Sequence, residues 1–177
     1  MIHAVTLSFD RPMNEILIDL WREIDTLVEG QPLINTNVRP HITLGLADGL
    51  DVEGFLPHWQ SLASETIPFA CSLSHIGCFT TGEQVVWLGP TVTGRLLFLH
   101  ARIDALLGEH AKNLDEHFRP DLWVPHVTMA IGITATQALR VVERLQGLKL
   151  PLTGEITEIN LVECEPPREK HRLPLGG

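Results

Sequence analysis

One short phrase occurs twice in this sequence and carries the side chains best suited to chemistry. Residues 40–45 are PHITLG and residues 125–130 are PHVTMA, so the two copies lie nearly half a chain apart. Each copy places a threonine two positions after a histidine and a small residue two positions further on. Because side chains alternate between the two faces of a β-strand, the histidine and threonine of each copy share a face. The opposite face is apolar and can pack on a core.

The histidines of the phrase, His41 and His126, suit a reaction that needs a general base and a general acid together. An unperturbed histidine titrates near pH ~6.5, so one imidazole can be neutral while the other is protonated. The hydroxyls of Thr43 and Thr128 can donate hydrogen bonds to anionic oxygens. In-line displacement at phosphorus takes a proton from the nucleophile and gives one to the leaving oxygen on the opposite side. The four groups therefore predict a phosphate site that needs no metal.

Simpler interpretations exist for each of these residue types. A single His-x-Thr strand is usually only a strand with a polar face, but two copies with matching proline and small residues favour a site. Trp87 and Trp123 could stack a base, although core packing is the more common role, and His100 falls on the apolar stripe of a helix. A metal site built from histidines and carboxylates lacks a recognised ligand spacing. Its members would be His110, His117, Glu109, Asp115 and Glu116.

Composition narrows the class of protein. The chain has 177 residues, of which 44% are hydrophobic and 20% charged, as in an ordinary globular domain. Its formal net charge of −9 disfavours a surface that tracks long double-stranded nucleic acid. The 3 cysteines have no metal-knuckle spacing and suit a reducing compartment. The first residues lack a signal-peptide pattern and no stretch is long enough to cross a membrane. We therefore expect a cytoplasmic monomer that does not bind membranes.

Local patterns predict the elements that must position the two phrases. Strands are expected at residues 2–9, 39–46, 67–79, 84–88, 124–132, 149–163 (with a break near Gly154) and 168–175. Helices are expected from Asp10 to Gly30, at 51–64, at 93–111 and from Thr134 to Gly147. Residues 80–83 are expected to form a turn.

The order of these elements indicates a weak internal duplication. A helix, a His-Thr strand and a second helix recur in both halves, and the mixture of helices and strands predicts an α+β fold. We expect one domain over residues 1–177, made of two pseudo-symmetric lobes that bring the two His-Thr faces into one cleft.

The doubled His-x-Thr phrase resembles the two-histidine (2H) phosphoesterase superfamily, in particular its 2′-5′ RNA ligase and RNA cyclic phosphodiesterase branch. The hairpin 77–89 and the lead-in 118–121 support the resemblance, which covers nearly the whole chain. It implies a bilobal α+β fold, with two mainly antiparallel sheets lining a central cleft and helices packed outside. It also implies that His41 and His126 form the acid–base pair and that Thr43 and Thr128 bind the phosphate, without a cofactor or a metal.

The chain departs from that pattern near its end. Many members carry a tyrosine or another aromatic residue near the cleft in the last strand, whereas this chain has no tyrosine and places His171 near that position. Arg39, Arg168 and Arg172 are the basic side chains nearest to the expected cleft in sequence. We therefore expect Arg39, Arg168 and His171 as additional substrate contacts.

The leading hypothesis is a metal-independent phosphodiesterase that opens 2′,3′-cyclic phosphates on nucleotides or short RNA ends, with 2′-5′ ligation as the reverse reaction. A first alternative is a cyclic phosphodiesterase for a nucleotide-derived small metabolite. A second is a non-catalytic module that only binds a phosphate or nucleotide, against which the presence of all four motif residues argues. A small cyclic nucleotide or a short RNA end is the expected partner.

Overall fold

The computed structural model covers residues 1–177 and describes all of them except residues 81 and 83. The helices are α1 (Arg11–Asp25), α2 (Val52–Glu65), α3 (Gly94–His110) and α4 (Ala135–Gln146). The strands are β1 (Ile2–Phe9), β2 (His41–Asp48), β3 (Phe69–Phe79), β4 (Gln84–Pro90), β5 (Asn113–Leu114), β6 (Val127–Ile133), β7 (Leu152–Cys164) and β8 (Pro167–Pro174). Two 3₁₀ turns, η1 (Leu33–Asn35) and η2 (Glu116–Phe118), precede the two His-Thr strands. The predicted α+β class is confirmed, and part of the predicted turn at 80–83 lies outside the described residues.

The described strands form one sheet rather than the two that the sequence predicted. Its order is β5-β2-β1-β7-β3-β4-β6, with β8 paired to β7, and all pairings between these strands are antiparallel. The physical reason is the length of β7. One end of β7 pairs with β1 and the other end pairs with β3, so a single strand joins both halves of the molecule. The duplicated, two-lobed arrangement itself stays a prediction.

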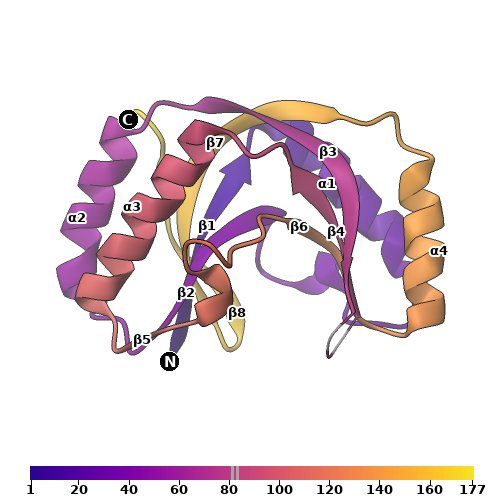
Figure 1. Cartoon of the computed structure of the whole chain (residues 1–177), viewed down its shortest axis with the longest axis horizontal. Helices are drawn as coiled ribbons and strands as arrows, with labels where there is room; N and C mark the ends of the chain where they lie inside the picture. Colours follow the sequence, from indigo (N-terminus) through magenta and orange to yellow (C-terminus); the bar gives the residue numbers. More distant parts are fainter. Residues whose placement is uncertain (81, 83) are drawn as a thin grey trace.

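The sheet is strongly curved, and Figure 1 shows it as an arch with helices on its outside. Strands β2 and β6, which belong to opposite ends of the sheet, contact each other across the arch. Helices α2 and α3 lie side by side at one end, and α4 lies at the other (Figure 1). Curvature therefore brings the two His-Thr phrases together although they are far apart in the hydrogen-bonded order.

The helices begin where the sequence places capping residues. Asp10 accepts a hydrogen bond from the Met13 N–H at 2.9 Å and starts α1. Thr134 and Gln137 form the predicted capping box of α4. Helix α2 forms in spite of an internal proline, Pro57, because its buried face packs into the core. No helix among the described residues is both long and apolar enough to cross a membrane.

Gly154 does not break the last long strand, which corrects the sequence prediction. It lies inside the continuous strand β7, where a Cβ atom would approach the Cβ of Met13 to 2.7 Å. The Asp10 carboxylate that caps α1 also accepts the Glu155 N–H at 2.7 Å. The glycine therefore permits close contact between α1 and β7 instead of ending the strand.

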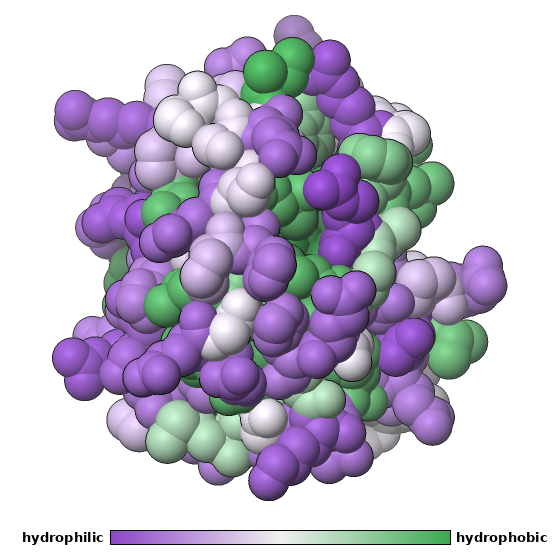
Figure 2. Space-filling model, turned by 90° about the vertical axis from the view of Figure 1, so that its left-hand side faces the viewer, coloured by the Kyte–Doolittle hydropathy of each residue, from purple (hydrophilic) through white to green (hydrophobic). Residues whose placement is uncertain are grey.

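Figure 2 shows the side of the molecule at the α2 and α3 end. This face is mainly hydrophilic, and its hydrophobic residues are scattered among polar ones (Figure 2). Isolated apolar residues on a surface are normal and do not indicate a binding site. The inner face of the arch is thus the better candidate for a functional surface.

Candidate active site

The two histidines occupy equivalent positions at the start of facing strands. His41 is the first residue of β2, and His126 directly precedes β6, one residue short of the strand in which the sequence placed it. Thr43 and Thr128 follow within β2 and β6. The side chains of His41, Thr43 and Thr128 all line one cavity of about 250 Å³ between the two strands. His126 is not among the residues that line this cavity; its ring centroid lies 5.0 Å from that of Phe79 and 5.9 Å from that of Trp87, which is paired with Thr128.

Each imidazole is held by the same local hydrogen bond. His41 Nδ1 lies 2.6 Å from the carbonyl oxygen of Arg39, and His126 Nδ1 lies 2.7 Å from that of Val124. A carbonyl oxygen only accepts, so Nδ1 carries the proton in both rings and Nε2 is the nitrogen left for chemistry. The intervening proline explains the geometry. It fixes its own φ and keeps the preceding residue extended, which directs that residue's carbonyl toward the ring two positions later.

Both imidazoles favour their neutral form. Burial lowers the pKa of His41, and the nearby charge of His126 lowers it further, against the raising effect of the Arg39 carbonyl. Burial likewise lowers the pKa of His126, with the Val124 carbonyl opposing it. Strands β2 and β6, which begin at His41 and directly after His126, contact each other.

Two tryptophans donate hydrogen bonds to the backbones of the two motif threonines. Trp21 of α1 donates its indole N–H to the carbonyl oxygen of Thr128 at 2.8 Å. Trp123, just ahead of β6, donates its indole N–H to the carbonyl oxygen of Thr43 at 2.9 Å. Trp21 comes before the first phrase and holds the threonine of the second, whereas Trp123 comes before the second phrase and holds the threonine of the first. We call this pair the indole braces.

The brace from Trp123 is itself fixed by a packed histidine. The rings of His100 and Trp123 stack with centroids 3.9 Å apart and an angle of 4° between their planes. His100 Nε2 lies 2.8 Å from the carbonyl oxygen of Phe118, which orients the ring. His100 is thus packed in the interior, as its place on an apolar helix stripe suggested. The position of the neighbouring Thr43 depends on this stack.

Arg39 lies beside the cleft but its guanidinium is already engaged. It contacts Glu158 at 2.6 Å and Glu169 at 3.2 Å, and Nη2 donates to Asn160 Oδ1 at 3.2 Å. Asn160 in turn donates to Ser8 Oγ at 2.7 Å on the inner face of the sheet. Two carboxylates surround one cation here, so Arg39 is better placed to fix the strand ends than to bind a phosphate.

The other two predicted contacts are not brought to the cleft. His171 pairs with Leu161, whose side chain is buried in the helix-covered core, and its ring meets Trp59 of α2 edge-on. Arg168 pairs with Glu163 on that same face of the sheet, and its side chain is exposed. Sequence position near the end of the chain could not show which face of β8 these residues occupy.

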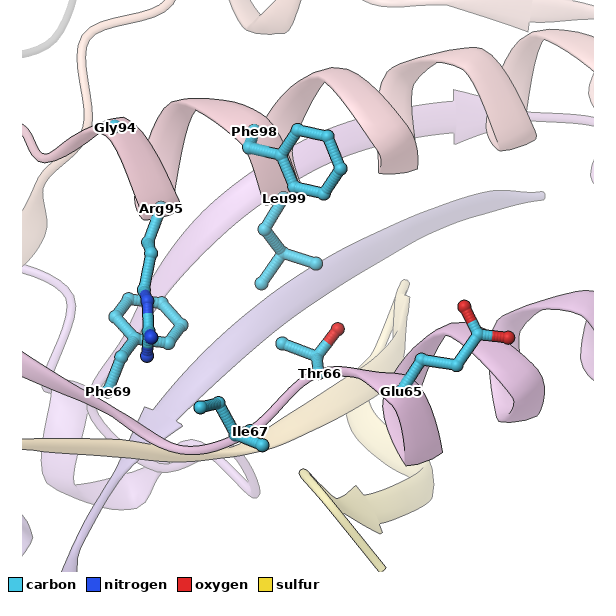
Figure 3. Close-up of a pocket in the computed structure, with 8 residues that line it drawn as sticks. All are labelled: Glu65, Thr66, Ile67, Phe69, Gly94, Arg95, Phe98 and Leu99. Atoms are coloured by element: carbon cyan, nitrogen blue, oxygen red, sulfur yellow. The ribbon is translucent and has the colours of Figure 1, made fainter.

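Within the described residues, no group of three or more histidine, cysteine, aspartate or glutamate side chains is arranged to hold a metal ion. A hollow of about 330 Å³ lies outside the arch, between the end of α2 and the first turns of α3. Figure 3 shows its lining, which includes Arg95 and Phe98 but no residue of the two phrases. The cleft between β2 and β6 is therefore the better candidate for an active site.

Comparison with known structures finds the same fold over the full length of the chain. Escherichia coli LigT in its apo form superposes with a TM-score of 0.65 at 18% identity, covering 99% of this chain and 98% of that one. TT0787 of Thermus thermophilus has a TM-score of 0.59 at 18% identity, covering 100% and 99%. Usb1 of Kluyveromyces marxianus has a TM-score of 0.57 at 12% identity, covering 98% and 97%. A search of curated proteins finds no match.

A family model of the 2′-5′ RNA ligase superfamily matches residues 17–166, which include both His-Thr phrases and both indole braces. This match covers most of the sequence and agrees with the fold of the structural neighbours. The chain therefore belongs to the 2′-5′ RNA ligase superfamily, a branch of the 2H phosphoesterases.

Proposed function

We propose that the protein is a metal-independent phosphodiesterase that hydrolyses 2′,3′-cyclic phosphates of nucleotides or short RNA ends. The observation that carries the proposal is the matched pair of imidazoles. Each donates Nδ1–H to the backbone two residues earlier and leaves Nε2 available, each comes two residues before a threonine, and both threonines line the cavity between the facing strands.

In the proposed reaction, one imidazole accepts a proton from water through Nε2 while the other, protonated, gives a proton to the departing ribose oxygen. A P–O bond to water forms as the P–O bond to ribose breaks, and the product is a phosphomonoester. The hydroxyls of Thr43 and Thr128 donate to the non-bridging oxygens, where negative charge is held. A positioned general acid or base contributes about 10²–10⁴-fold. If the 5′-hydroxyl of a second RNA took the place of water, its oxygen would bond to phosphorus as the bond to the 3′-oxygen breaks, and the two RNA ends would be joined through a 2′-5′ bond.

The two lowered pKa values fit this division of roles. The neutral form is favoured in both rings, which supplies the base at neutral pH. When substrate enters, its negative charge favours protonation of a neighbouring ring, which supplies the acid. Both rings and both hydroxyls come from one chain, so the proposed site needs no second subunit.

The charge around the cleft favours a small substrate. None of the described side chains that line the cavity is a lysine or an arginine, and Arg39 is held by two carboxylates. A chain of phosphates would meet little positive potential here. Escherichia coli LigT, which has a similar fold, has been crystallised with 3′-AMP, with ATP and with NADP⁺, and these small ligands support the proposal of a small nucleotide substrate. A nucleotide-derived cyclic metabolite is the second candidate substrate on the same grounds.

The test is turnover of 2′,3′-cyclic nucleotides, with product identified by phosphorus NMR and with a metal chelator in a parallel sample. We expect hydrolysis to a phosphomonoester at the same rate with and without chelator. Loss of activity on chelation would contradict the metal-independent mechanism. Absence of turnover for every cyclic nucleotide and short RNA tested would refute the proposed activity.

A further inference from the structure

Three aromatic rings of the β3–β4 hairpin lead toward His126 and have no role in the proposed proton transfers. The ring centroids of His75 and Trp87 are 5.6 Å apart, and those of Phe79 and Trp87 are 5.3 Å apart. Phe79 meets the His126 ring nearly at right angles, with centroids 5.0 Å apart. We call His75, Phe79 and Trp87 the aromatic wall.

The strand register places this wall on the inner face of the arch. Trp87 pairs with Gly77 on one side and with Thr128 on the other. His75 pairs with Gly89 in the same hairpin. Directly paired residues in antiparallel strands share a face, so the wall lies on the same surface as the proposed phosphate ligand Thr128.

Two glycines make room for the wall. A Cβ atom at Gly77 would overlap the six-membered ring of Trp87, and a Cβ atom at Gly89 would overlap the imidazole of His75. The rings therefore lie against bare strand backbone, where any other residue would push them away. Glycine within a strand is otherwise unfavourable and often marks a close approach. These two positions are thus explained by the need for a flat aromatic layer.

The three rings of the wall differ in exposure, so one ring supports the others and two are accessible. Trp87 is only 8% exposed and supports the other rings. His75 is exposed and Phe79 is partly exposed. Core packing alone would explain Trp87, as the sequence led us to expect, but it does not explain a histidine ring left open to solvent on top of it. The accessible rings are a surface on which a planar group can stack.

The opposite side of the cleft has different chemistry. The cavity beside His41 is lined mainly by aliphatic side chains, among them Leu33, Val38 and Val162. Its one tryptophan, Trp21, already donates its N–H to Thr128. A nucleobase gains more from stacking on aromatic rings than from contact with aliphatic chains. The wall also carries no lysine or arginine, so it suits an uncharged ring rather than a second phosphate.

We propose that the aromatic wall binds the nucleobase of the substrate, through stacking on His75 and Phe79, while the attached cyclic phosphate lies between His41 and His126. This inference rests on the proposed function and adds which side of the cleft holds the base. It makes His75 and Phe79 determinants of specificity for substrates that carry a planar ring.

Binding rather than turnover provides the test, so that the two proposals can fail separately. In an inactive His41→Asn background, calorimetry would measure the affinity for adenosine 2′,3′-cyclic phosphate and for the base-free glycerol 1,2-cyclic phosphate. We expect His75→Ala and Phe79→Leu each to weaken binding of the adenosine compound about 5- to 10-fold. Binding of the glycerol compound should stay within twofold. His75→Phe should restore affinity for the adenosine compound because it restores a ring.

His58→Ala is the matched control, because His58 is an exposed histidine on the outer helix α2, and both affinities should be unchanged. The inference is overturned if His75→Ala and Phe79→Leu leave the adenosine affinity unchanged, or if they weaken both compounds equally. Ring-dependent binding without turnover by the wild-type protein would instead refute the proposed activity and keep the aromatic wall as a base-binding site.

Discussion

The indole brace from Trp123 can be removed with little change in packing. The substitution Trp123→Phe deletes the N–H that lies 2.9 Å from the Thr43 carbonyl but keeps an aromatic ring for the stack on His100, whose centroid is 3.9 Å away. Strand β2 is paired with β5 only at Ala47 and Asp48, so among the described residues no neighbouring strand holds the Thr43 carbonyl on that side. That carbonyl would be left without its partner.

An unpaired buried carbonyl costs about 1–3 kcal/mol. Since ~1.4 kcal/mol corresponds to tenfold in rate, we expect kcat/KM for a 2′,3′-cyclic nucleotide to fall about 5- to 140-fold if the brace positions the Thr43 hydroxyl in the transition state. The fall should lie mostly in kcat, because a misplaced hydroxyl affects the transition state more than ground-state binding. Steady-state kinetics and a thermal melt on the same sample provide the measurement.

Trp59→Phe provides a matched control. Trp59 is a fully buried tryptophan of α2, and its indole N–H has no hydrogen-bond partner among the described residues, so its removal should leave kcat unchanged. A melting temperature lowered by a few degrees in Trp123→Phe, together with kcat within twofold of the wild type, would show that the brace only stabilises the fold. That result would refute the positioning argument.

Further outcomes follow from the same contacts. Trp21→Phe should lower kcat by a factor similar to that for Trp123→Phe, because it releases the Thr128 carbonyl. Steady-state kinetics of the two variants, measured side by side, test this expectation. Arg39→Gln should destabilise the fold by about 1–3 kcal/mol, measured by urea unfolding, since Glu158 and Glu169 would lose their shared cation; an unchanged unfolding midpoint would contradict this. The pKa of each of the two histidines, His41 and His126, is lowered in the folded protein, so below pH ~6.5 the unfolded chain binds more protons. Above that pH these two groups leave the free energy of unfolding unaffected, and as the pH falls below it they should lower the free energy of unfolding. Urea unfolding at a series of pH values measures this dependence, and His41→Asn should make the loss of stability toward acid pH smaller.

The features of the candidate site that the sequence could predict are those whose geometry is local. Alternation along a strand is enough to place a histidine and the threonine two positions later on one face. The hydrogen bond from His41 Nδ1 to the carbonyl of Arg39 also spans only two residues, and it follows from the proline between them. Repetition of the phrase then indicated that the two copies act together.

Contacts between distant segments could not be predicted in this way. The indole braces join residues 107 and 80 positions apart, and the apolar spacing around Trp21 predicted only a buried helix face. Arg39 looked like a free phosphate contact because its partners Glu158 and Glu169 come from strands at the far end of the chain. The aromatic wall depends likewise on glycines across a hairpin, which a single sequence does not distinguish from turn residues.

The claim that His41 and His126 form one site is tested most directly by the rates of His41→Asn, His126→Asn and the double variant on one cyclic nucleotide. Two groups that act in the same transition state are strongly non-additive when removed. We therefore expect each single variant to lose about 10²-fold or more in kcat, and the double variant to be little slower than the slower single one. Wild-type rates in both single variants would contradict the account.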